Sequence, residues 1–292
     1  MKPRPKSVVL DVLSTLKGRA APVRLLVAVA EIFDIDPNAT RVAVTRLLSS
    51  GLIERDERGA YRTGEAAAPI LGRLGTWRNI NRRTRAWSGH WIGATPDAGL
   101  PAKESRALSV RALEFSGMRE FSPGLWVRPD NIEGGVVAVR EALRGLRLPA
   151  TCPVFSIRDC DDACNARAQT LWDADRILSR YRDLRKALED SAARLPDMEE
   201  TKAMAECFLL GGEAIRLLVL DPLLPNEIVP TAERDELVHA MRAYDQVGRR
   251  CWKPFLDRYG VLVGEPPMDR QVWRDAASGG GIDFASASGE LS

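Results

Sequence analysis

The stretch ATRVAVTRLLSSGLIERDERGAYRTGE, from Ala39 to Glu65, decides how the N-terminal part of this chain is expected to fold. Gly51 is placed to end a helix, and the residues around Asp56–Gly59 predict the turn of a two-stranded hairpin. Before Gly51, apolar residues recur at helical spacing and are expected to face a core. Ala43, Val44 and Leu47 have this spacing, and Leu52, which follows the glycine, is expected to face the same core.

Two more helices are expected ahead of this stretch. The segment SVVLDVLSTL begins at Ser7, a residue type that caps helices well, and Gly18 follows its end. A second helix is predicted after Pro22, and the turn DIDP leads to Asn38, which we expect to cap the third helix. The order helix, helix, turn, helix, hairpin is typical of a winged helix-turn-helix domain.

The third helix is expected to turn a polar face outward. Arginines three to five residues apart on an exposed helix can contact guanine edges or phosphates in the major groove of DNA, and a basic hairpin can lie along the backbone. The predicted DNA contacts on the helix are Asn38, Thr40, Arg41, Thr45 and Arg46, and those on the hairpin are Arg55, Arg58 and Arg62. The alternative is a winged helix that binds only protein.

The charge of the chain is unevenly distributed. Its 292 residues carry a net charge of +2, but residues 1–90 hold 16 Lys and Arg against 8 Asp and Glu. A basic end is what a protein needs if that end meets phosphates. With 45% hydrophobic residues and no apolar stretch long enough for a membrane span or a signal peptide, we expect a cytoplasmic protein without membrane contact.

The rest of the chain predicts an α+β multidomain protein. Strands at HWIGAT, GLWVRP and CPVFSIRD alternate with helices, which favours helices packed on one face of an antiparallel sheet. Helical spacing then dominates, with an expected core that includes Tyr181 and Leu188 and a last long helix near 233–259. The expected domains are 1–66 winged helix, 67–86 linker helix, 87–165 central domain, 166–275 helical domain and 276–292 flexible tail.

Most catalytic chemistry is poorly supported. The chain has neither a Gly-rich phosphate loop nor a Gly-x-Ser-x-Gly elbow, and only two histidines. We therefore expect no catalytic residue, no metal and no cofactor. Cys152, Cys160 and Cys164 lie close in sequence, but their spacing matches no strong metal template, and buried, inert thiols are the favoured reading. A metal-dependent nuclease using Asp97 remains an alternative.

Several separated motifs resemble the PaaX-type regulators, the repressors of phenylacetate catabolism. Besides the opening stretch they are WSGHW, SVRALEFSGMREFSPGLWVRPDNI, LWDADRILSRYRDL and LDPLLPNEIVP, in the order that family shows. Where the family usually has a Trp-Pro-Gly stretch, this chain has TAERDEL instead. The resemblance covers residues 7 to about 258. It implies a ferredoxin-like (Cas2-like) central domain, a homodimer on a palindromic operator of double-stranded DNA, and release by a small acyl-CoA thioester such as phenylacetyl-CoA.

Two groups of side chains, arginines and aromatic residues, are the candidates for binding such an effector. The arginines of WRNINRRTR could contact an anionic ligand or the DNA backbone, or form only a solvated helix face. The aromatic residues between Trp87 and Trp126 either fill the core of the central domain or form the wall of a pocket for an aryl or acyl group. The candidate effector residues are Arg82, Arg83, Trp91, Trp126, Arg128 and Arg216.

Overall fold

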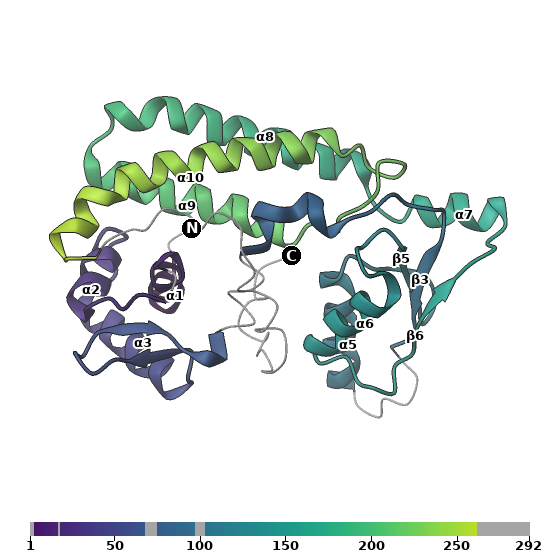
Figure 1. The fold of residues 1–292 in the computed structure, drawn as a ribbon, viewed down its shortest axis with the longest axis horizontal. Helices are drawn as coiled ribbons and strands as arrows, with labels where there is room; N and C mark the ends of the chain where they lie inside the picture. Colours follow the sequence, from purple (N-terminus) through teal and green to yellow (C-terminus); the bar gives the residue numbers. More distant parts are fainter. Residues whose placement is uncertain (1–2, 17, 68–74, 97–102, 262–292) are drawn as a thin grey trace. The chain divides into compact units, whose positions relative to one another are not determined.

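The computed structural model describes residues 3–16, 18–67, 75–96 and 103–261. They form two compact units, and each unit is assembled from separate segments of the chain (Figure 1). The first comprises Met1–Gly75, Leu188–Glu213 and Met241–Ser292, and the second comprises Thr76–Ala187 and Ala214–Ala240. The helical region predicted at 166–275 thus contributes to both units. The predicted tail, 276–292, lies outside the described residues.

The first unit begins with three helices and a hairpin. The helices are α1 (Pro5–Thr15), α2 (Val23–Glu31) and α3 (Pro37–Ser49), and β1 (Ile53–Arg55) pairs antiparallel with β2 (Tyr61–Thr63). A bridge between Ala21 and Tyr61 ties the chain ahead of α2 to the hairpin. The described part of this unit therefore follows the predicted element order.

Both predicted N-caps in this unit are wrong. Helix α1 starts at Pro5 rather than after Ser7, since a proline in the first turn loses no hydrogen bond there. Helix α3 is capped by Asp36 rather than Asn38. The Asp36 carboxylate accepts hydrogen bonds from the backbone N–H groups of Asn38 at 2.8 Å and Ala39 at 3.1 Å. Asn38 lies in the first turn of α3, and its side chain is exposed.

The core of the first unit joins segments that are far apart in the sequence. Apolar side chains of α1 and α2 pack with Val44, Leu47 and Ile53, and with Leu256 from the end of α10 (Ala232–Arg258). Phe208 of α9 (Glu200–Val219) is also packed against this cluster. Burial of apolar surface is the main force that holds such a module together. Because one face of α3 is committed to this core, the opposite face is presented to solvent.

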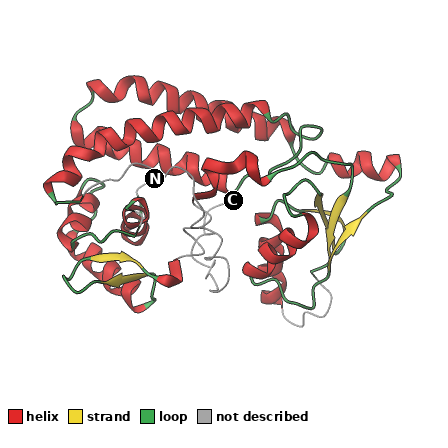
Figure 2. Ribbon diagram, viewed as in Figure 1, coloured by secondary structure: helices red, strands yellow, loops and turns green. Residues whose placement is uncertain are grey.

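The second unit contains a four-stranded antiparallel sheet in the order β4-β5-β3-β6 (Figure 2). The strands are β3 (Trp91–Ala94), β4 (Arg119–Ser122), β5 (Leu125–Pro129) and β6 (Val154–Ile157). The sequence predicted β3, β5 and β6 but missed β4. That strand has the sequence REFS and is half-exposed, so no clear apolar alternation marks it. Gly124, with φ of +78°, allows the tight turn that returns it to β5.

The sheet is covered on both faces. Helices α5 (Lys103–Phe115) and α6 (Gly135–Gly145) lie on one face (Figure 2). The other face, with Trp91 and Val127, packs against Trp172 and Leu224. The Trp91 and Trp172 rings are stacked, with centroids 6.1 Å apart and planes 11° apart. Elements that follow the sheet in sequence, among them α7 (Asp162–Gln169) and α8 (Ala174–Arg194), supply this second layer.

Within the linker predicted at 67–86, Thr76–Arg83 forms a 3₁₀ segment, η2, rather than an α-helix, and it is interrupted at Asn79, where φ is −119°. Another 3₁₀ segment, η1 (Glu65–Ala67), lies at the start of the linker. The apolar residues Trp77 and Ile80 of η2 are buried, so packing rather than helix propensity determines this conformation.

The predicted helical core and last helix agree with the structure. Tyr181, Leu184 and Leu188 are buried, and α10 ends at Arg258, close to the predicted limit. Among the described residues, no helix combines the length and the apolar character needed to cross a bilayer.

Candidate nucleic-acid interface

Helix α3 presents a polar, positively charged face to solvent. Ala43, Val44 and Leu47 are buried, and the residues between them are turned outward. The exposed side chains of this face are Asn38, Arg41, Val42, Thr45 and Arg46. No acidic residue occurs between Pro37 and Ser49, so the charge of this face is positive.

Thr40 is the exception among the predicted helix contacts. Its side chain is fully buried, and the hydroxyl donates a hydrogen bond to the backbone carbonyl oxygen of Asp36 at 3.2 Å. A threonine one turn into a helix often bonds the preceding turn in this way. Thr40 therefore supports the start of α3 and has no exposed surface to offer a partner.

The exposed face is organised by contacts within the helix. One terminal nitrogen of Arg41 donates to the side-chain oxygen of Asn38 at 3.1 Å, and the Thr45 hydroxyl donates to the Arg41 carbonyl at 3.1 Å. Arg46 lies in the last turn, where a positive charge is favoured by the helix dipole. Two guanidinium groups thus project from one ordered surface of about two helical turns.

The hairpin is less basic than its arginines suggest. Arg55, Arg58 and Arg62 are all exposed, but Glu54, Asp56 and Glu57 balance their charge within the same strands and turn. Arg62 Nε lies 2.5 Å from a carboxylate oxygen of Glu54. Positive charge is therefore concentrated on α3, and the hairpin offers donors without a net charge.

The hairpin tip is ordered by its own turn chemistry. The Asp56 carboxylate accepts from the backbone N–H groups of Arg58 at 3.0 Å and Ala60 at 2.8 Å. Gly59 has φ of +80°, which other residues adopt at a cost. Because this geometry fixes the backbone, Arg58 projects from a defined position.

The structure does not gather the six candidate effector residues into one site. Arg82 and Arg216 are exposed, whereas Trp91 and Trp126 are buried in the layers on either side of the sheet. The Trp91 indole N–H donates to the Asn165 side chain at 3.0 Å. Trp91 is thus a core residue, as the structural interpretation of these aromatics predicted.

Arg128 is also a structural residue. Its side chain is buried and donates to the backbone carbonyl oxygens of Ser116 and Pro222, the latter at 3.1 Å, and to Asn131 at 3.4 Å. Burial, and the nearby positive charge of Arg83, lower the pKa of the Arg128 guanidinium to about 10. The group remains charged at neutral pH and links β5 to two loops.

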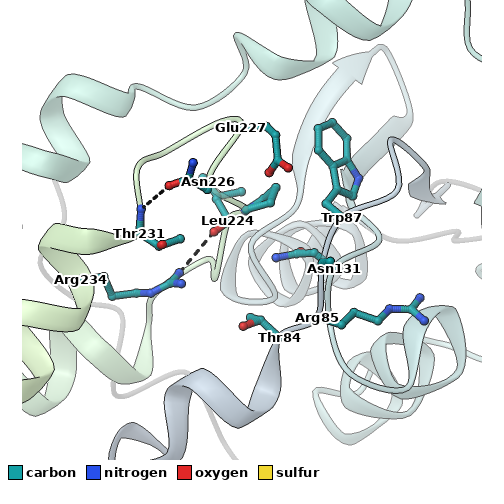
Figure 3. A pocket seen from close by; sticks show the side chains of 11 residues that line it. Thr84, Arg85, Trp87, Asn131, Leu224, Asn226, Glu227, Thr231 and Arg234 are labelled. Carbon is teal, nitrogen blue, oxygen red and sulfur yellow. Dashed lines mark hydrogen bonds between the residues drawn. The ribbon is translucent and has the colours of Figure 1, made fainter.

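A pocket that the sequence reasoning missed lies in the second unit (Figure 3). It has a volume of about 200 Å³, and none of the six candidates lines it. Leu224, Pro225, Asn226 and Glu227 contribute to its wall, and all four belong to the motif LDPLLPNEIVP. That motif is the sequence signal that could have indicated the pocket, because prolines around polar residues fix the conformation of a loop.

The structure gives no support to metal chemistry in the described residues. Within those ranges, no group of three or more His, Cys, Asp or Glu side chains could hold a metal ion. Cys152 is buried, and Cys160 and Cys164 are partly buried. Burial raises the pKa of the Cys160 thiol, so its reactive thiolate is disfavoured. Asp97, the candidate nuclease residue, lies outside the described residues.

Comparison with known proteins agrees with the resemblance noted in the sequence. A solved structure, "Uncharacterized protein Rv0674 from Mycobacterium tuberculosis", is similar in fold with a TM-score of 0.58. The two are 24% identical, and the match covers 85% of this chain and 98% of that one. No curated protein matches. Residues 172–253 match the family model "PaaX-like protein C-terminal domain". The chain therefore carries a PaaX-like C-terminal domain, which confirms the family resemblance predicted from its sequence.

Proposed function

We propose that this protein is a DNA-binding transcriptional regulator that contacts duplex DNA through the exposed face of α3. One observation carries the proposal. Arg41 and Arg46 project from a helix whose opposite side is locked into a core, with no acidic residue between them. A helix of this kind fits the major groove, where arginines contact guanine and phosphate.

The order of elements around α3 supports a winged-helix arrangement. The hairpin β1–β2 follows α3 directly, as a wing does, and its exposed arginines would contact the backbone beside the groove. The β-α-β-β-α-β order of the second unit, with strand order β4-β5-β3-β6, supports a ferredoxin-like interpretation of that part. We propose both domain folds together with the domain limits 1–66, 67–86, 87–165, 166–275 and 276–292.

The PaaX-like match at residues 172–253 suggests the mode of regulation. In this proposal the protein is a homodimer and a repressor of an aromatic or acyl-CoA catabolic operon. Two copies of α3 would enter successive major grooves about 34 Å apart. A small acyl-CoA effector would change that spacing and release the operator. Arg82, with the other exposed arginines of its segment, offers donors for the phosphates of such an effector.

The proposal is tested by binding to DNA of known sequence. The full chain is incubated with the region upstream of its own gene, and separately with a random duplex pool for site selection. We expect a retarded complex that survives competitor DNA, and selected sites with two-fold symmetry. The double variant Arg41→Ala/Arg46→Ala should lose at least about 30-fold in affinity, at 1–3 kcal/mol for each arginine.

A charge-matched control separates recognition from general attraction. Arg176 and Arg180 are exposed on α8 in the second unit, and their double alanine variant removes the same charge. It should bind like the unmodified protein. Equal binding by the α3 variant would contradict the proposal. Absence of any DNA complex would favour a protein-interaction module, and Mg²⁺-dependent cleavage lost on Asp97→Asn would favour a nuclease.

A further inference from the structure

The pocket in the second unit has two unlike walls. Figure 3 shows Thr231 and Arg234, at the start of α10, on one side and Trp87 and Asn131 on the other. Leu224 and Pro225 add apolar surface between them. A site with an apolar body and a few convergent polar groups is the usual form of a small-molecule pocket.

Arg234 is nine-tenths buried and incompletely satisfied. Its Nη1 atom lies 3.3 Å from the carbonyl oxygen of Leu224 and 3.6 Å from a carboxylate oxygen of Asp221. Its Nε–H is buried, and it has no hydrogen-bond partner in the part of the chain that the structure describes. A guanidinium offers five donors, so unmet donors at a buried site carry a free-energy cost.

The groups around this pocket carry more positive charge than negative charge. Arg83, Arg128 and Arg234 lie close to the buried carboxylate of Asp221, and Asp130 also acts on Arg128. Asp221 also accepts from the Tyr181 hydroxyl and from the backbone N–H of Leu223, so it is shared among several donors.

Two more charged groups leave that imbalance in place. Arg85, another residue of the pocket wall, is paired with Asp130 at 2.8 Å. Glu227 also lines the pocket, but it is exposed and its charge is screened by water. Buried charge in excess of its counter-charge is costly, and a bound anion would offset that cost.

We infer that this pocket binds a small organic carboxylate, with the anionic group toward Arg234 and Thr231 and a flat apolar body against Trp87, Leu224 and Pro225. Thr231 and Arg234 also lie at the N-terminal end of α10, where the helix dipole favours an anion. The pocket holds the equivalent of about seven water molecules. That volume is enough for a single ring with a carboxylate.

The test uses the full chain without DNA, so it does not rest on the proposed function. Binding of sodium benzoate is measured by calorimetry and by thermal unfolding, against benzamide as the neutral isostere and against phosphate. We expect saturating benzoate to raise Tm by about 2 °C or more, and benzamide and phosphate to leave it unchanged. Binding of phosphate in preference to benzoate, or equal binding of benzamide, would overturn the carboxylate assignment.

Two substitutions locate the binding. Ala86 is an exposed residue of the pocket wall, so Ala86→Trp should fill the space without disturbing the core and should abolish the benzoate shift. Ala142→Trp, at an exposed position of α6 outside the pocket, should keep the shift. Arg234→Lys should weaken binding at least about tenfold, and if that variant does not fold, the Ala86 pair decides. Benzoate binding that persists in Ala86→Trp, or no benzoate binding to the unmodified chain, would refute the inference.

Discussion

Replacing Arg128 with leucine tests whether this arginine is structural. The change removes a buried charged donor from the carbonyl oxygens of Ser116 and Pro222 and from Asn131, and leaves those acceptors without it. Removing one partner of a buried charged network costs about 3–5 kcal/mol. For a protein of this size we therefore expect Tm to fall by about 6–20 °C.

The measurement is thermal and urea unfolding of the full chain, followed by circular dichroism and tryptophan fluorescence. Arg158→Leu, an exposed arginine in the same unit, is the matched control and should change stability by less than about 0.5 kcal/mol. DNA affinity at a temperature where Arg128→Leu is folded should remain unchanged. A loss of stability below about 1 kcal/mol would refute the structural role and return Arg128 to the ligand-binding candidates.

Three further substitutions probe the first unit, each measured as Tm of the full chain. Asp36→Ala removes the cap of α3 and should cost about 1 kcal/mol; no change would contradict the cap. In Gly64→Ala the new Cβ would lie 2.3 Å from the backbone oxygen of Gly51, so we expect a loss of about 1–3 kcal/mol, and an unaltered Tm would show that the hairpin can shift freely. Burial raises the pKa of Cys207 to about 12. The contribution of the neutral Cys207 thiol to the free energy of unfolding is therefore complete below the unfolded thiol pKa of about 8.5. That contribution is lost as pH rises toward 12. The fall of Tm between pH 8 and 10 should be shallower in Cys207→Ala, and equal slopes would contradict this assignment.

The N-terminal elements were predictable because local signals agreed with each other. Apolar spacing in α3, Gly51 after its end and Gly59 in the hairpin turn all favour one arrangement, and the structure has it. The exposed face of α3 followed from the same spacing. Thr40 was wrongly predicted as a DNA contact, because the sequence alone does not show that its hydroxyl bonds to the preceding turn.

The rest depended on contacts that are distant in sequence. No sequence signal near α3 predicts that Leu256, about two hundred residues later, packs into the same core. Strand β4 is set by pairing with β5 rather than by its own composition, and the linker conformation is set by burial of Trp77. The pocket was missed because Arg85 and Arg234, far apart in sequence, line the same pocket only through the fold, although the proline-rich motif marked one wall.

The most direct test of the central claim is the salt dependence of DNA binding. Affinity of the full chain for its selected site is measured by fluorescence anisotropy between 50 and 300 mM salt, for the unmodified protein and Arg41→Ala/Arg46→Ala. Each lost phosphate contact should reduce the slope of log K against log salt by about 0.9. We expect the α3 variant to lose affinity and up to about two units of slope, while the α8 control variant keeps both. An α3 variant with unchanged affinity and slope would show that this helix does not enter the groove.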